Sequence, residues 1–244
     1  MKKVRLDKLL VDHGAFADEA EALRAIVAHE VKVDDVYATS AAMKVAPDAD
    51  VWVKGRSQYV SRGGLKLRGA LDAFEFDVSG LSCIDAGCST GGFTDCLLQA
   101  GAAHVVAVDV GYGDLAWKLR QDPRVAVFER TNIRTADPSE LGAPFDLIVA
   151  DLSFIGLASL ASVFAGLSAK GTTFIGLVKP QFESHHDETD HGLVRDEDVR
   201  VRTIDEVKKA LSRAGFACEG VVESTLRGKK AGNVEYLLKA VFTG

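Results

Sequence analysis

One short run in the chain constrains the fold most, because it joins a buried strand to a helix through a turn rich in glycine. The run is Ile84-Asp85-Ala86-Gly87-Cys88-Ser89-Thr90-Gly91-Gly92-Phe93-Thr94. Apolar residues up to Ile84 predict a strand, and after the turn apolar residues recur at helical spacing from Phe93 to Leu98. The first backbone N–H groups of a helix have no partner within it. We therefore expect a nucleotide-like ligand on this turn.

An acidic residue about twenty positions further on supports the same interpretation. The apolar run 104–108 predicts a strand that ends at Asp109, where a carboxylate can accept both hydroxyls of a ribose. The spacing Asp85-x-Gly87-x-x-x-Gly91 differs from the dinucleotide pattern Gly-x-Gly-x-x-Gly. It resembles the S-adenosylmethionine (AdoMet) loop of Rossmann-like methyltransferases. A purely structural strand–turn–helix is the alternative, and Asp109 weighs against it.

Apolar runs alternate with helical segments through the rest of the chain. This alternation predicts an α/β fold, a Rossmann-like domain with a mostly parallel seven-stranded sheet covered on both faces. Ligands of such sheets bind at the carboxyl ends of the strands. The last two runs are separated only by a charged loop and predict a hairpin at one end of the sheet. The expected strands are 82–85, 105–109, 125–128, 145–150, 173–178, 216–224 and 234–241.

Residues 1–58 predict a separate α+β module, joined by a linker at 59–65 to a domain at 66–244. Two short amphipathic helices are indicated by Leu6, Leu9 and Leu10, and then by Ala20, Leu23, Ile26 and Val27. The alternating runs 31–33 and 51–53 predict strands. The pattern resembles the S4 RNA-binding fold. It departs from that fold at Ala17-Asp18 and Asp34-Asp35, and residues 1–60 carry a net charge of −1.

The composition predicts a cytoplasmic protein with no membrane-spanning segment. Of the 244 residues, 47% are hydrophobic, yet no run approaches the roughly 20 apolar residues that span a bilayer. Charged residues follow Met1-Lys2-Lys3 where a signal peptide would have an apolar core. The net charge of −6 argues against a protein that coats nucleic acid indiscriminately.

A local basic strip still favours contact with nucleic acid. No acidic residue interrupts the chain from Lys54 to Arg68, a composition that suits phosphate contacts and one stacking ring. A solvated hinge is the alternative. A second cluster consists of Arg227, Lys229 and Lys230. The candidate RNA-binding residues are Lys54, Arg56, Tyr59, Arg62 and Arg68.

Four ionisable residues lie where a site at the carboxyl edge of the sheet would use them. Asp151 and Lys179 each follow a predicted strand, and Lys66 lies on the helix before the sheet. Glu235 lies in an apolar run, where an unpaired charge is costly to bury. Each residue has an ordinary structural explanation by itself. Their combination in one sheet indicates a catalytic site.

Over nearly its whole length the chain resembles the TlyA (hemolysin A) family, whose members are S4-containing ribosomal RNA 2′-O-methyltransferases of the FtsJ/RrmJ class. The matching segments are 60–67, 85–95, 109–113, 115–120, 129–132, 151–155, 178–183 and 232–235. The resemblance implies AdoMet as cofactor, ribosomal RNA or a ribosomal subunit as partner, and a catalytic tetrad of Lys66, Asp151, Lys179 and Glu235. The implied cofactor contacts, with their loop neighbours, are Asp85, Gly87, Ser89, Thr90, Gly91, Gly92, Phe93, Asp109, Val110, Asn132 and Asp151.

The expected chemistry is in-line attack of a ribose hydroxyl on the AdoMet methyl group, which requires loss of the hydroxyl proton. We assign Lys179 to accept or steer this proton and Lys66 to orient the ribose. Asp151 then positions Lys179, and Glu235 fixes Lys66. The alternatives are a non-catalytic RNA-binding protein with a retained cofactor fold, a small-molecule methyltransferase and a membrane-active hemolysin.

The loop from Glu183 to Arg195 is rich in histidine and aspartate, where relatives usually carry glycine and lysine. Its spacing fits no usual helical or finger-type metal site. A solvated loop explains it, so no metal site is predicted.

Overall fold

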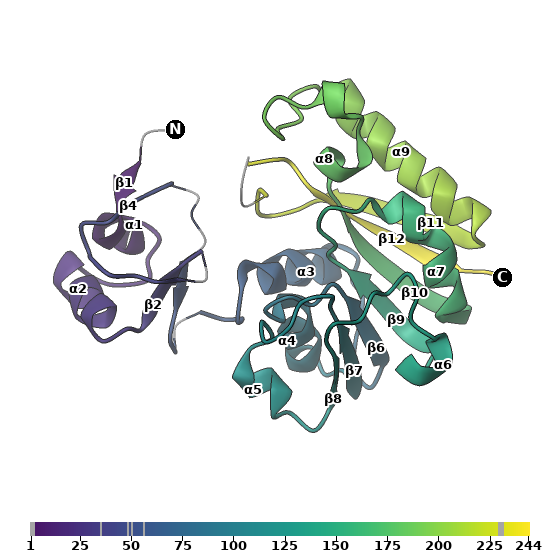
Figure 1. Ribbon diagram of the computed structural model, residues 1–244, viewed down its shortest axis with the longest axis horizontal. Helices are drawn as coiled ribbons and strands as arrows, with labels where there is room; N and C mark the ends of the chain where they lie inside the picture. Colours follow the sequence, from purple (N-terminus) through teal and green to yellow (C-terminus); the bar gives the residue numbers. More distant parts are fainter. Residues whose placement is uncertain (1–2, 35, 48, 50, 56, 229–231) are drawn as a thin grey trace. The chain divides into compact units, whose positions relative to one another are not determined.

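The computed structural model describes residues 3–34, 36–47, 49, 51–55, 57–228 and 232–244 (Figure 1). The chain divides into two compact units, Met1–Ser61 and Arg62–Gly244. The second unit opens on helix α3 (Arg62–Ala73), so the linker predicted at 59–65 is too long at its C-terminal end. Gly63 and Gly64 suggest a linker by composition. They belong, however, to a helix whose side chains Leu67, Ala70 and Leu71 are buried. Their packing outweighs the poor helix propensity of glycine.

The first unit is a small α+β module. It contains α1 (Leu6–Asp12), α2 (Glu19–Val27), a two-stranded sheet of β1 (Val4–Arg5) and β4 (Lys44–Val45), and a three-stranded sheet of β2 (Val31–Val33), β3 (Val36–Tyr37) and β5 (Val51–Val53). The expected helices and the strands 31–33 and 51–53 are present. The buried face of α2 differs from the expected one: Ala22, Ala25 and Ile26 are buried, while Leu23 and Val27 are 47% and 69% exposed. Asp18 caps α2 and fixes its first residue by accepting the N–H of Glu21.

The second unit contains the predicted seven-stranded sheet, in the order β11-β12-β10-β9-β6-β7-β8. β10, β9, β6, β7 and β8 are parallel neighbours, and the hairpin β11–β12 forms one end, with β12 antiparallel to β10. The fold-class prediction is confirmed. The strands are β6 (Ser82–Ala86), β7 (His104–Val108), β8 (Val125–Phe128), β9 (Phe145–Ala150), β10 (Ser168–Val178), β11 (Phe216–Glu223) and β12 (Tyr236–Phe242).

Helices cover both faces of this sheet, as Figure 1 shows. On one face lie α3, α4 (Gly92–Gln99) and α5 (Trp117–Arg120); on the other lie α6 (Pro138–Leu141), α7 (Ala161–Gly166) and α9 (Glu197–Arg213). The core on the second face is built around fully buried side chains such as Ile148, Phe164 and Phe174. Three short helical turns complete the connections at the carboxyl edge: η1 (Leu157–Leu160), α8 (Pro180–Glu183) and η2 (His186–Glu188).

The direction of β12 explains how residues far apart in sequence reach one edge. Parallel strands present their C-terminal ends at one edge of the sheet. Because β12 is antiparallel to β10, Tyr236 pairs with Val178, and the first residues of β12 lie beside the last residues of β10. Glu235, which immediately precedes β12, therefore lies at the same edge as Lys179.

Candidate active site

The turn after β6 depends on two glycines. Gly87 has φ +86°, and a β-carbon there would lie 2.8 Å from the carbonyl oxygen of Asp151. Gly91 has φ +93° and precedes α4, where a β-carbon would overlap Leu115 and Leu119. Only glycine allows both the left-handed backbone and these close approaches. The turn thus lies against the ends of β6 and β9, and the first N–H groups of α4 follow it.

Asp85 lies underneath this turn and supports it. Its side chain is fully buried, and its Oδ2 accepts the backbone N–H of Thr94 at 2.9 Å and the Thr94 hydroxyl at 2.7 Å. Desolvation raises the pKa of Asp85 to about 7, although the bonds from Thr94 oppose this shift. Asp85, Thr90, Gly91, Gly92 and Phe93 were expected to contact the cofactor, but none of them is among the described residues that line the cavity beside the turn. The buried side chains of Asp85 and Phe93 support the turn from the interior.

We predict that Asp85→Asn makes the protein more stable at pH 8 than the wild type. The pKa is raised from 3.8 to about 7 on folding, so the folded state binds a proton more tightly, and stability falls as pH rises between these values. Asparagine removes this loss, which is on the order of 4 kcal/mol at most. Thermal unfolding should show a gain that grows from pH 4 to pH 7 and is constant above. A gain independent of pH would refute the assignment.

Asp109 follows β7 and faces the cavity beside the turn. Its Oδ2 accepts the N–H of Ser89 at 2.8 Å, and its Oδ1 accepts the N–H of Gly111 at 2.7 Å. Each oxygen keeps a second lone pair for a ligand hydroxyl. The cavity has a volume of ≈ 350 Å³, within the range of cofactor sites. It is lined by Gly87, Ser89, Val108, Asp109, Val110, Thr131, Asn132, Ile133, Asp151, Leu152, Ser153, Phe154, Ile155 and Leu160.

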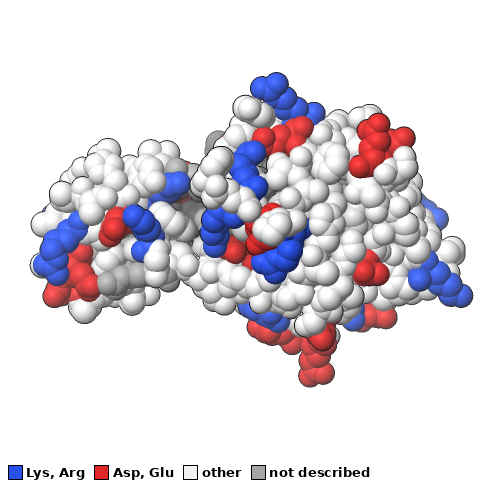
Figure 2. Space-filling model, turned by 90° about the horizontal axis from the view of Figure 1, so that it is seen from below, with Lys and Arg blue, Asp and Glu red and all other residues white. Residues whose placement is uncertain are grey.

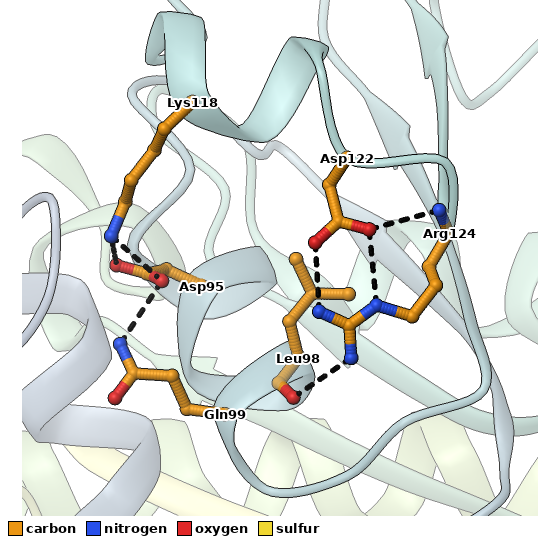
Figure 3. Close-up of polar contacts among 6 residues, drawn as sticks. All are labelled: Asp95, Leu98, Gln99, Lys118, Asp122 and Arg124. Atoms are coloured by element: carbon orange, nitrogen blue, oxygen red, sulfur yellow. Dashed lines mark hydrogen bonds and ion pairs between the residues drawn. The ribbon is translucent and has the colours of Figure 1, made fainter.

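A polar network on the outer side of α4 holds α5 against the turn. Figure 3 shows the Lys118 ammonium on both carboxylate oxygens of Asp95, at 3.1 and 2.9 Å, with Gln99 donating to the same group. Beside them, Arg124 pairs with Asp122 and donates to the carbonyl oxygen of Leu98. A backbone bond also links the start of α5 to the turn: Ala116, which precedes α5, donates its N–H to the carbonyl oxygen of Thr90. The shape of the turn is therefore fixed from outside.

The four expected catalytic residues form two ion pairs. Lys179, directly after β10, lies 2.5 Å from Asp151 Oδ1, directly after β9, and its Nζ is 3.4 Å from Ser153 Oγ. Lys66, on α3, donates to Glu235 Oε2 at 2.5 Å. Lys66 and Glu235 are 8% and 3% exposed, so each neutralises a charge that would be costly alone. The structure contains both pairings expected from the sequence.

A second cavity, of ≈ 330 Å³, adjoins the first because both are lined by Ser153 and Phe154. Lys179 and Glu235 line it too, together with Gln181, Phe182, His191, Gly192, Gly228 and Asn233. The site thus consists of a cavity beside Asp109 and a cavity beside Lys179, with a shared wall.

Sequence reasoning missed the aromatic residue in the shared wall. Phe154 is 81% exposed and has φ +69°, a strained conformation for a bulky residue, and its ring lies 5.7 Å from that of Phe182. An apolar residue directly after Asp151-Leu152-Ser153, outside any strand, was the available signal.

The basic strip is less available to RNA than its sequence indicates. Tyr59 is 5% exposed and cannot serve as a stacking platform in this conformation. Arg68 pairs with Asp72 at 2.6 Å, Lys54 lies 4.0 Å from Glu30, and Arg62 donates to the carbonyl oxygen of Arg227. These partners lie outside the window that contains no acidic residue. Arg56, Lys229 and Lys230 lie outside the described residues. Figure 2 likewise shows basic and acidic side chains interspersed on one face.

The segment 185–191 is held by ion pairs and by a buried amide. Glu188 pairs with Arg202 at 2.5 Å, and Asp190 pairs with Arg195 at 3.1 Å. Asn233 donates to the carbonyl oxygen of Gly192 and accepts the N–H of Val194, both across the sheet edge. The side chain of His186 lies outside the described residues. Among described residues, no three His, Cys, Asp or Glu side chains are placed to share a metal ion, and no helix has the length and apolarity to cross a membrane.

Comparisons with known proteins agree with this architecture. The chain is 44% identical to the 16S/23S rRNA (cytidine-2′-O)-methyltransferase TlyA of Mycobacterium tuberculosis, over 97% of this chain and 89% of the relative. It is 35% identical to Hemolysin A of Brachyspira hyodysenteriae, over 96% of this chain and 98% of the relative. A solved structure from Streptococcus thermophilus, named as a hemolysin, is 36% identical with a TM-score of 0.78, covering 100% of this chain and 90% of that chain.

The family comparison covers nearly the whole second unit. The FtsJ-like methyltransferase model matches residues 59–242, which include both cavities and both ion pairs. This match and the relatives confirm the resemblance noted in the sequence. The chain belongs to the FtsJ-like methyltransferase family.

Proposed function

We propose that this protein transfers the methyl group of AdoMet to a ribose 2′-hydroxyl of ribosomal RNA. The observation that carries the proposal is the pair of adjoining cavities, one beside Asp109 and one beside the Lys179–Asp151 ion pair. A cofactor in the first cavity and a ribose in the second meet at Ser153 and Phe154. The relative from Mycobacterium tuberculosis, by name a cytidine-2′-O-methyltransferase of 16S and 23S rRNA, supports this substrate class.

The cavity beside Asp109 fits AdoMet. The Asp109 oxygens accept the N–H groups of Ser89 and Gly111 and would accept the two ribose hydroxyls of the cofactor, while Val110 and Asn132 line the same cavity. The glycines of the turn leave room for backbone contact with the cofactor. AdoMet, when bound, supplies an electrophilic methyl group on a cationic sulfur. The carboxylates of Asp109 and Asp151 both lie along this cavity and favour that positive charge.

Lys179 acts on the acceptor hydroxyl. Its Nζ contacts the 2′-oxygen of the target ribose and orients a lone pair toward the methyl group, a positioning effect. In the transfer, the methyl–sulfur bond of AdoMet would break as the new C–O bond forms, leaving the neutral thioether, and Nζ would steer the hydroxyl proton toward the carboxylate of Asp151, 2.5 Å from Nζ. Ser153 Oγ, 3.4 Å from Nζ, limits the rotation of the lysine.

The Lys66–Glu235 pair shapes the far side of the acceptor cavity. Glu235 lines the cavity beside Lys179, and its bond to Lys66 joins α3 to β12. We assign Lys66 to orient the target ribose and Glu235 to hold Lys66 in place.

The first unit supplies an S4-like RNA-binding domain in this proposal, and the protein acts in the cytoplasm, where ribosomal RNA is found. Near the C-terminal end of the first unit, the side chain of Lys54 is 68% exposed. Lys54 and Arg62 are retained as candidate phosphate contacts.

The proposed function is tested by mapping 2′-O-methyl groups in ribosomal RNA. Ribosomal subunits lacking the modification are incubated with the purified protein and AdoMet, and then compared with subunits incubated without the protein. A new, protein-dependent 2′-O-methyl group at a defined nucleotide is expected. Methylation of a base nitrogen or carbon only, or of no nucleotide in either subunit, would rule the proposal out.

We predict that Phe154→Ala raises the KM for RNA about tenfold or more, because base–aromatic stacking contributes roughly 1–3 kcal/mol per base. The exposed ring beside Phe182 stacks on the base of the target nucleotide. Initial rates over a range of RNA concentrations measure the effect, with AdoMet saturating. Tyr112→Ala is the matched control, since Tyr112 is 67% exposed and is absent from the described lining of the acceptor cavity. An unchanged KM in the Phe154 variant would contradict the stacking role.

A further inference from the structure

A partly buried carboxylate joins two walls of the acceptor cavity. Glu183 is the last residue of α8, and its Oε1 accepts the backbone N–H of Leu157 at 2.5 Å, at the first residue of η1. The backbone N–H of Ala158 also contacts this carboxylate. Two orphan donors at the start of η1 are thus satisfied by a side chain from another element.

The neighbouring glycine is required by this contact. A β-carbon on Gly156 would lie 2.5 Å from Glu183 Oε2 and 2.9 Å from the carbonyl oxygen of Phe182. The φ of Gly156 is −75°, which any residue can adopt. Glycine is therefore needed here for space, so that the loop can approach α8.

The two elements that Glu183 joins carry the reacting groups. The loop 151–156 contains Asp151, Ser153 and Phe154, while α8 directly follows Lys179 and contains Phe182. At one end, loop and helix are linked by the Lys179–Asp151 pair, and in the middle by the contact between the two phenylalanine rings. Glu183 supplies the link at the other end.

This link carries an energetic cost. Desolvation raises the pKa of Glu183, and among the described residues no lysine or arginine forms an ion pair with it. The two backbone N–H groups offset part of that cost.

We propose that Glu183 is a positioning residue, which holds the loop 151–157 against α8 and thereby fixes Phe154 and Ser153 relative to Lys179. The role in RNA turnover rests on the proposed function. The contact between Glu183 and the first residues of η1 can be tested without RNA.

The first experiment measures amide hydrogen exchange of the segment 153–160 in Glu183→Ala, Glu183→Gln and the wild type. Loss of a charged acceptor is expected to speed exchange at Leu157 and Ala158 about tenfold or more in the alanine variant. Glutamine keeps one acceptor oxygen and restores most of the protection. Gly156→Ala should reproduce the fast exchange with Glu183 intact, because its β-carbon displaces the carboxylate. Unchanged exchange in Glu183→Ala and Gly156→Ala would show that Glu183 does not hold this segment against α8.

The second experiment separates positioning from general stability by kinetics. Glu183→Ala should lower kcat/KM for RNA about tenfold or more, with AdoMet affinity within about twofold of the wild type, and Glu183→Gln should recover most of the loss. Glu219→Ala is the matched control, because Glu219 lies on β11, pairs with Lys239 at 2.9 Å and is not among the described residues that line either cavity. Wild-type kinetics in Glu183→Ala would overturn the positioning role. A wild type that methylates no RNA would instead overturn the proposed function. The exchange experiment would still show whether Glu183 holds the segment 151–157 against α8.

Discussion

Replacing Lys179 by alanine is expected to abolish methyl transfer to RNA while leaving AdoMet binding nearly intact. The ammonium group lies 2.5 Å from Asp151 and lines the acceptor cavity, so we expect it to act on the ribose hydroxyl. Loss of a group that handles a proton in the transition state typically lowers the rate by about 10²–10⁴-fold. The measurement is a single-turnover assay of methyl incorporation into RNA, with AdoMet affinity from calorimetric titration.

Lys170→Ala is the matched control, since Lys170 is an exposed lysine on the same strand, β10. It should retain both activity and binding. Turnover of the Lys179 variant close to the wild-type rate would refute the mechanism. A large loss of AdoMet affinity in that variant would move Lys179 from the acceptor side of the site to the cofactor side.

Replacing Asp109 by alanine has the second largest expected effect: AdoMet binding weakens tenfold or more. Hydrogen bonds to a charged group contribute roughly 1.5–3 kcal/mol, and the loss here removes both ribose contacts. The variant also loses the acceptors for the N–H groups of Ser89 and Gly111, which hold the turn around the cofactor. Calorimetric titration with AdoMet measures the effect directly.

The control for this prediction is Asp146→Ala. Asp146 lies in β9 near its start and accepts the N–H of Ser82 at 2.9 Å, at the sheet edge opposite the cavities. Its removal should leave AdoMet affinity unchanged. If Asp109→Ala bound AdoMet as tightly as the wild type, Asp109 would have no place in the cofactor site.

Strand positions in the second unit were predictable from sequence because most of these strands contain a run of apolar residues. β8 and β9 have the bounds that were expected, 125–128 and 145–150. β10 begins earlier, at Ser168, because the polar residues before Thr173 extend the strand beyond its buried part. The pairing of Asp151 with Lys179 followed from topology, since adjacent parallel strands end side by side.

Features that depend on distant partners were not predictable from local patterns. The exposure of Leu23 and Val27 follows from the rotation of α2, which the packing of Ala22 and Ala25 determines. Arg68 belongs to a helical pair with Asp72 that a count of charges up to residue 68 omits. The bond of Glu183 to Leu157 joins positions that no periodicity relates.

The antiparallel β12 has a consequence for the order in which the protein becomes functional. The residues beside Asp109 come from the contiguous stretch 87–160, whereas the Lys66–Glu235 bond joins positions 169 apart in the sequence. Contacts of such long sequence separation carry a large loop-closure entropy and slow folding. We therefore expect the cofactor cavity, built from one stretch of chain, to form earlier in folding than the acceptor cavity, which needs the C-terminal hairpin. Binding of AdoMet would then become possible earlier in folding than methyl transfer.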